Sequence, residues 1–224
     1  MSEASLEEQA DEFAADLTDV LQRTLPEAPT AGAEVAGDRV IVSPSGDVPL
    51  FVDGVRLATL RIRMHCELDS RGTWLAVEAS KVALVAELDK TPIIRFDYVR
   101  KPHKCPSAHI QVHAHRGALT HLLSQSGHKT PHDISTLHIP VGGSRFRPCI
   151  EDIIQFVIEE CGFDRLDAYT HALEEGRERW RRVQAKAVAR DFPEEAAETL
   201  VALGYEVTGP DNPESLPHKA LHVW

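Results

Sequence analysis

Alternating histidines along residues 107–116 form the pattern in this chain that is best suited to chemistry. In the segment SAHIQVHAHR, His109, Gln111, His113 and His115 occupy every second position. Along a β-strand, residues two apart share one face and lie roughly 6.5–7 Å from one another. The residues between them are apolar. We therefore predict a strand that turns its apolar side to the core and its imidazoles to an open face.

The preceding apolar segment, IIRFDY at residues 93–98, places Arg95 and Asp97 on one side of a second predicted strand. If the two strands pair through the connection at residues 100–106, both side chains lie beside the histidines. Imidazoles, a carboxylate and a guanidinium would then share one face of a sheet.

One chemistry that suits this face is metal binding. Histidines at positions i and i+2 of a strand can reach the same ion, so His113 and His115 are candidate ligands, with Asp97 or a third histidine completing the site. A divalent metal such as zinc or manganese would fit, although no cofactor is certain from the sequence. His103 and Cys105, together with His109, could also be metal ligands, but no companion pair at a standard spacing supports them.

A second chemistry is cleavage of a phosphodiester without a metal. His109, His113 and His115, with Asp97, would supply the general acid and base near neutral pH. The side chains that could bind the anionic phosphate are Arg95, Arg116, Arg145 and Arg147. A polar face that serves only binding or structure remains open beside both chemistries.

The charge of the chain is unevenly distributed. The net charge is −11, which argues against a general nucleic-acid or membrane-surface binder. Residues 1–37 are strongly acidic, whereas residues 95–147 carry eight Lys or Arg against two Asp and hold eight of the twelve histidines. This basic island could bind RNA, DNA or a nucleotide.

The beginning of the chain and its apolar runs bear on its location. The sequence MSEASLEEQADEF has neither the basic region nor the apolar run of a signal peptide, and no apolar stretch is long enough to span a membrane. The four cysteines are scattered without a CxxC pair. We expect a cytoplasmic protein with reduced thiols and no membrane contact.

The order of the elements predicts an α+β fold. An amphipathic helix at residues 1–25 is followed by a linker at 26–37 and an α+β core domain at 38–162. The core would be an antiparallel β-meander sheet, and a helical region at 163–208 and an irregular tail at 209–224 would follow it. The first helix would either pack on its own domain or bind a protein partner, including a second copy in a homodimer.

Residues 93–160 also resemble a prokaryotic family of undefined biochemical role. The shared arrangement is RFDY…SHxxx…RxP…FIxFI, which appears here as IIRFDY, SAHIQVH and RFRPCIEDIIQFVIEE. The resemblance implies that Arg95, Asp97, His109 and Arg147 are the corresponding residues. Proteins of this kind are suspected in bacterial defence or toxin–antitoxin loci, which implies a nuclease or a protein that binds a partner.

Two functions follow as expectations. The first is a binding or regulatory component of a bacterial stress or defence system, toxin–antitoxin-like in kind, and the lack of a complete catalytic motif favours it. The second is a histidine-dependent hydrolase or nuclease that acts on a phosphodiester, with or without a metal. The histidine face and the basic island favour this alternative.

Overall fold

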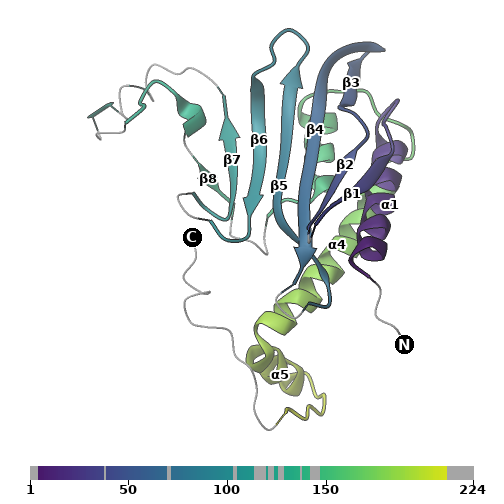
Figure 1. Cartoon of the computed structure of the whole chain (residues 1–224), viewed down its shortest axis with the longest axis vertical. Coiled ribbons are helices and arrows are strands. Elements are labelled where there is room, and N and C mark those ends of the chain that lie inside the picture. Colours follow the sequence, from purple (N-terminus) through teal and green to yellow (C-terminus); the bar gives the residue numbers. More distant parts are fainter. Residues whose placement is uncertain are drawn as a thin grey trace.

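The computed structural model describes most of the chain. The described residues are 5–37, 39–69, 72–102, 105–113, 120, 124–125, 129–136, 138–141 and 147–210. They form a helix, a sheet and then further helices, which confirms the α+β class (Figure 1). No helix in these residues is long and apolar enough to cross a membrane.

One antiparallel sheet of eight strands is the centre of the fold. Its order is β1-β2-β4-β5-β6-β7-β8, and β3 pairs with β4 away from this path. Most neighbours in the sheet are also neighbours in sequence, as expected for a meander. The strands are β1 (Ala31–Ala36), β2 (Arg39–Pro44), β3 (Val48–Val52), β4 (Val55–Leu68), β5 (Leu75–Ala86), β6 (Pro92–Val99), β7 (Ala108–Val112) and β8 (Ile139–Pro140).

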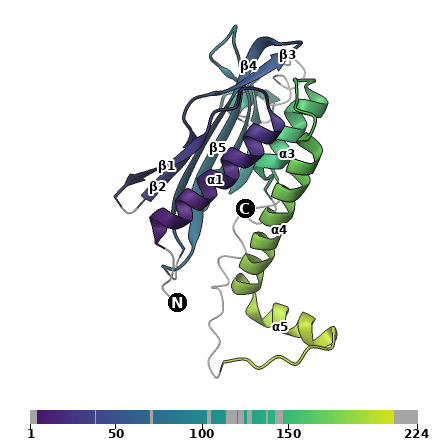
Figure 2. The same ribbon diagram turned by 90° about the vertical axis from the view of Figure 1, so that its right-hand side faces the viewer.

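Helices cover one side of this sheet, where α1, α3 and α4 lie together (Figure 2). Ser5 caps α1 through a capping box with Glu8. A short 3₁₀ turn, η1, precedes β8, and α3 continues directly into a π-helical turn, η2, while α5 follows α4. The bounds are α1 (Leu6–Thr24), η1 (Ile134–Thr136), α3 (Ile150–Gln155), η2 (Phe156–Glu160), α4 (Tyr169–Asp191) and α5 (Pro193–Ala202).

The core lies between the sheet and these helices. It combines the apolar side of α1 with alternate residues of the central strands and with α3 and η2. Its largest fully buried side chains include Leu21, Leu50, Leu60, Ile154 and Leu173. The apolar stripe of α1 is therefore buried against the sheet of its own chain.

The segment predicted as a linker, residues 26–37, contains a strand. The sequence AGAEVA at residues 31–36 is rich in small residues and lacks the apolar alternation that indicates a strand. All six of its residues nevertheless pair with β2, from Ala31 opposite Pro44 to Ala36 opposite Arg39. The segment at 55–69, which could have been one strand or two, is the single long strand β4.

The predicted division between a core domain and a C-terminal helical region does not appear as a gap in packing. α4 contacts both α1 and α3, and Leu173 belongs to the main core. Gly176 sets the close approach of α4 to α3, because a Cβ there would overlap Glu151 Oε1. Among the α-helices of the described chain, α5 differs in having no buried residue.

Candidate functional site

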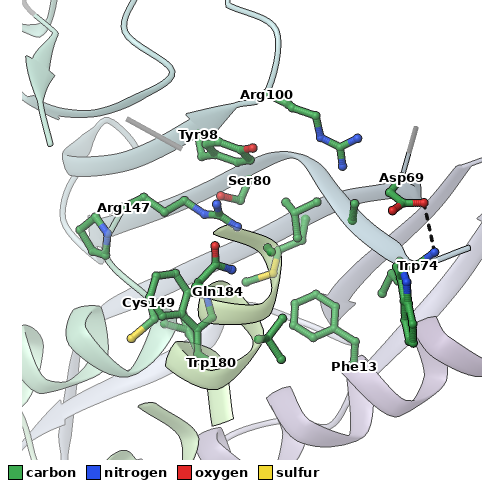
Figure 3. Close-up of a pocket in the computed structure, with 18 of the residues that line it drawn as sticks. Phe13, Asp69, Trp74, Ser80, Tyr98, Arg100, Arg147, Cys149, Trp180 and Gln184 are labelled. Carbon is green, nitrogen blue, oxygen red and sulfur yellow. Dashed lines mark hydrogen bonds between the residues drawn. The ribbon is translucent and has the colours of Figure 1, made fainter. Parts of the chain in front are cut away.

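A cavity between the sheet and the helical layer is the main candidate site (Figure 3). Its volume is about 1200 Å³, somewhat above the range of roughly 300–1,000 Å³ that is common for ligand sites. Walls come from α1, β4, β5, β6 and α3, and α4 covers it from the helical side. The cavity is therefore built from segments that are far apart in the sequence.

The path of α4 explains why this space exists. Near its start, Ala172, Leu173 and Gly176 are buried against the rest of the helical layer. Further along, α4 turns Trp180 and Gln184 towards the sheet without filling the gap (Figure 3). At its far end the Arg190 guanidinium lies 5.8 Å from the ring centre of Trp74. The helix thus contacts its surroundings at both ends and leaves a hollow between them.

The β4–β5 hairpin is held against α1 at the edge of this hollow. The Gln9 side-chain amide donates to the Thr73 carbonyl at 3.0 Å, and the Leu75 amide donates to Gln9 Oε1 at 2.8 Å. Asp69 accepts from the backbone amide of Trp74 at 3.2 Å (Figure 3). These bonds position Trp74 at the rim, where its side chain is half exposed.

Two arginines form a cationic end of the cavity. The Arg147 guanidinium lies 4.0 Å from the ring centre of Tyr98 and extends towards Gln184 of α4 (Figure 3). Arg100 pairs with Glu67 through Nη1 at 3.2 Å, while its Nη2 is buried without a hydrogen-bond partner among the described residues. A buried donor in this state is costly unless something accepts from it. The cationic end can therefore accept an anion.

Both guanidinium groups act on the same buried thiol. Burial raises the pKa of Cys66 to about 12, and the positive charges of Arg100 and Arg147 oppose this rise. Burial also raises the pKa of the Cys149 thiol, and the nearby Glu151 charge raises it further. Both thiols are protonated at neutral pH, so neither is an activated nucleophile.

The rest of the lining is mainly apolar and aromatic. Gln184 Oε1 is an exception, because it is buried and has no hydrogen-bond partner within the described part of the chain. Several carboxylates at the cavity are already engaged: Glu67 with Arg100, Asp16 with Arg179 and Asp69 with backbone amides. The larger apolar lining residues include Phe13, Met64, Trp74, Phe96, Ile150, Ile153 and Trp180.

The predicted pairing of the IIRFDY and SAHIQVH segments is present as β6 and β7. Asp97 lies opposite His109 and Arg95 lies opposite Gln111. The Arg95 guanidinium pairs with Asp97 Oδ2, and His109 Nε2 is 3.9 Å from the same oxygen. The structure therefore brings the carboxylate, the guanidinium and one imidazole together.

The prediction that this histidine face is open was wrong. His109 is only 4% exposed and Gln111 8%, whereas Ile110 and Val112 on the other face are half-buried. The reason is that residues 129–136 and 138–141 lie across β7. Gln111 donates to the Ser135 carbonyl at 2.8 Å, and the His109 and His138 rings meet edge to face with centres 4.6 Å apart. Burial lowers the pKa of His138, and the neighbouring His109 lowers it further.

The other predicted site residues are divided between described and undescribed parts of the chain. His113 follows β7, and its Nε2 is buried without a hydrogen-bond partner among the described residues. His115, Arg116 and Arg145 lie outside the described residues, so the predicted His113–His115 metal pair does too. Arg147 lines the cavity, and its anion-binding role stays a prediction.

Sequence reasoning did not select Arg100, Trp74 or Trp180 for the cavity, or His138 for the histidine cluster. Arg100 was visible only as part of the basic island, and each tryptophan looked like an ordinary packing residue. His138 belonged to the histidine-rich stretch but had no spacing that linked it to His109. Their proximity depends on sheet pairing and helix packing.

No family model, curated protein or solved structure matches this chain. The function is therefore inferred from the geometry of the site.

Proposed function

We propose that this is a binding protein whose cavity holds an amphipathic anion, a small molecule with a carboxylate or phosphate head and an apolar body. The observation that carries the proposal is the buried Nη2 of Arg100, which has no hydrogen-bond partner among the described residues. Arg100 and Arg147 both act on the charge of Cys66, and both line a cavity in which apolar residues outnumber polar ones. Guanidinium groups bind carboxylates and phosphates with charge-assisted hydrogen bonds.

The apolar walls support a ligand with a sizeable hydrophobic part. Aromatic side chains from α1, the β4–β5 hairpin and α4 face the hollow (Figure 3). Burial of apolar surface stabilises a complex by about 25 cal/mol per Å² before the costs of association. The apolar body of such a ligand would contact this surface, while its head would bind at the cationic end.

Binding is better supported than catalysis. The Cys66 and Cys149 thiols, both buried near the cavity, are protonated at neutral pH because burial raises the pKa of each. The alternative of phosphodiester hydrolysis would centre on His109 and Asp97, whose side chains are only 4% and 6% exposed. A polymeric substrate cannot reach groups buried to this extent without movement of the segments that cover β7, residues 129–136 and 138–141. Membership of a stress or defence system stays a prediction.

A titration with matched head groups tests the proposal. Dodecanoate, dodecanol and dodecyltrimethylammonium share one chain length and differ in charge. Binding is followed by isothermal titration calorimetry, below the critical micelle concentrations of the two ionic compounds and below the solubility limit of dodecanol. We expect one dodecanoate per protein chain and much weaker binding of the other two compounds. Equal affinity for all three would contradict an anion site.

Arginine variants locate the head group. Arg147→Gln and Arg100→Gln should each weaken dodecanoate binding about 10–100-fold, because a hydrogen bond to a charged group contributes about 1.5–3 kcal/mol. The matched control is Arg56→Gln, since Arg56 is exposed, pairs with Glu87 at 2.6 Å and does not line the cavity. A loss of affinity as large in the control would also contradict the proposal.

A further inference from the structure

A cysteine and two histidines gather on the side of β7 that residues 129–136 and 138–141 cover. Cys105 lies in the loop before β7, His109 on β7 and His138 just before β8. One ligand atom from each lies within 4.8 Å of the other two. Tetrahedral zinc, with bonds of about 2.0–2.3 Å, holds its donors roughly 3.3–3.8 Å apart. The three side chains therefore need only small adjustments to meet one ion.

Hydrogen bonding fixes the form of the His109 ring. Its Nδ1 is 2.9 Å from the Pro106 carbonyl oxygen, which can only accept. Nδ1 must therefore carry the hydrogen, and Nε2 of the neutral ring keeps a lone pair. Histidine ligands of metals usually donate their other ring nitrogen to a carbonyl or carboxylate in this way.

The His138 ring is held by a hydrogen-bond donor instead of an acceptor. Its Nε2 is 3.3 Å from the Gln111 side-chain nitrogen, which can only donate. His138 Nε2 thus also presents a lone pair, and the Gln111 amide retains its bond to the Ser135 carbonyl if a metal takes that lone pair. Both imidazoles are in the form that binds a cation.

A buried carboxylate beside the cluster is an independent indication of a cation. Asp97 Oδ2 is 3.9 Å from His109 Nε2, while Asp97 Oδ1 is buried and has no hydrogen-bond partner among the described residues. Arg95 engages only Oδ2. Asp97 is the nearest further donor, and its charge would offset that of a bound ion.

We propose that Cys105, His109 and His138 bind one zinc ion, with Asp97 or a water in the fourth position. The donor set decides the metal, because a thiolate with two imidazoles suits zinc, whereas manganese and magnesium prefer oxygen. The ion would join the loop before β7 and the segment before β8 to the edge of the sheet. His109 and Asp97 also line the proposed ligand cavity, but the zinc proposal does not depend on the two arginines that would bind the anion. Its ligands differ from the His113–His115 pair predicted from the sequence.

Cobalt substitution tests the site directly. The purified protein is stripped with a chelator, and Co²⁺ is titrated while the absorbance is recorded. We expect one ion per chain, with a thiolate-to-cobalt charge-transfer band and the strong d–d bands of a tetrahedral ion, and displacement of cobalt by one equivalent of zinc. No saturable binding, or a spectrum without the charge-transfer band, would overturn the proposal.

Variants assign the ligands. Cys105→Ser should abolish the charge-transfer band, and His138→Gln should weaken zinc binding more than about tenfold. The controls are Cys161→Ser and His171→Gln, because both residues are exposed and far from the cluster in the sequence. Far-ultraviolet circular dichroism checks that each variant is folded. Cys105→Ser is the primary test, because Cys105 is only half-buried and its replacement should disturb the fold little. Unchanged binding by folded Cys105→Ser, or loss only in His113→Gln, would contradict the assignment.

Discussion

Gly176 lies where α4 meets α3, and its missing side chain leaves room for Glu151. A Cβ at position 176 would overlap Glu151 Oε1 and lie 3.0 Å from Glu151 Cγ and Cδ. Since Glu151 is only 6% exposed, its carboxyl group cannot simply swing into solvent. Gly176→Ala should therefore either push Glu151 into its neighbours or move α4 away from α3.

The expected change in the free energy of unfolding of Gly176→Ala is the sum of three contributions. Alanine is favoured over glycine in a helix by about 1 kcal/mol. Overpacking of a buried contact costs about 1–3 kcal/mol, and loss of the Cys149–Glu151 hydrogen bond costs about 1 kcal/mol more. We expect Gly176→Ala to lower the free energy of unfolding by about 1–3 kcal/mol. An exposed glycine in a helix would give a change of the opposite sign.

Urea denaturation followed by circular dichroism measures this change, and a double-mutant cycle identifies its cause. Truncation in Glu151→Ala removes the obstructing carboxyl group, so adding Gly176→Ala to that variant should stabilise it by about 1 kcal/mol. If Gly176→Ala stabilises the wild-type protein instead, the contact between α3 and α4 is not as close as described. If the two substitutions are additive, Glu151 is not the obstacle.

Three further perturbations test the packing around the site. Burial raises the pKa of Glu151 above its ordinary value of 4.5. Between 4.5 and the higher pKa of the folded state, the folded protein binds more protons than the unfolded one, so the free energy of unfolding falls as pH rises. Glu151→Gln should therefore raise the melting temperature more at pH 8 than at pH 4, and an equal change at both pH values would contradict this. Ile110→Asp should lower the free energy of unfolding clearly less than Ile154→Asp does, because Ile110 is half-buried and Ile154 fully buried. Equal losses in urea denaturation would show that Ile110 is as deeply buried as Ile154. Gln9→Ala should lose about 1–2 kcal/mol with its two bonds to the β4–β5 hairpin, while Gln22→Ala, which loses one exposed bond of 3.4 Å, should change stability little.

The sequence allowed most of the fold to be predicted, because period and turn signals are local. Alternation in IIRFDY and SAHIQVH indicated two strands, and their short connection allowed them to pair. The structure shows that they do, with Asp97 opposite His109. The strand at residues 31–36 was missed because AGAEVA has little apolar alternation and is held mainly by its pairing with β2.

The sites were harder to predict because they depend on contacts across long sequence distances. An apolar/polar pattern shows that two faces of a strand differ, but not that a later segment covers the polar one, and so His109 was placed on an open face. Arg147 was selected for its position before a helix. The cavity that it lines also depends on Trp180 and Gln184 of α4, which follow it by more than thirty residues in the sequence. Cys105 and His109 had metal-ligand character in the sequence, but only the pairing of β7 with β8 brings His138 beside them.

Quenching of Trp180 by a brominated fatty acid tests whether the ligand lies in the cavity that Trp180 lines, because bromine quenches tryptophan fluorescence only near contact. The chain has three tryptophans, so Trp74→Phe combined with Trp224→Phe leaves Trp180 as the only reporter. We predict that bromododecanoate quenches this fluorescence to saturation at one equivalent per chain, and that Arg147→Gln requires much more ligand for the same effect. Saturable calorimetric binding of bromododecanoate without quenching of Trp180 would place the ligand elsewhere and contradict the account.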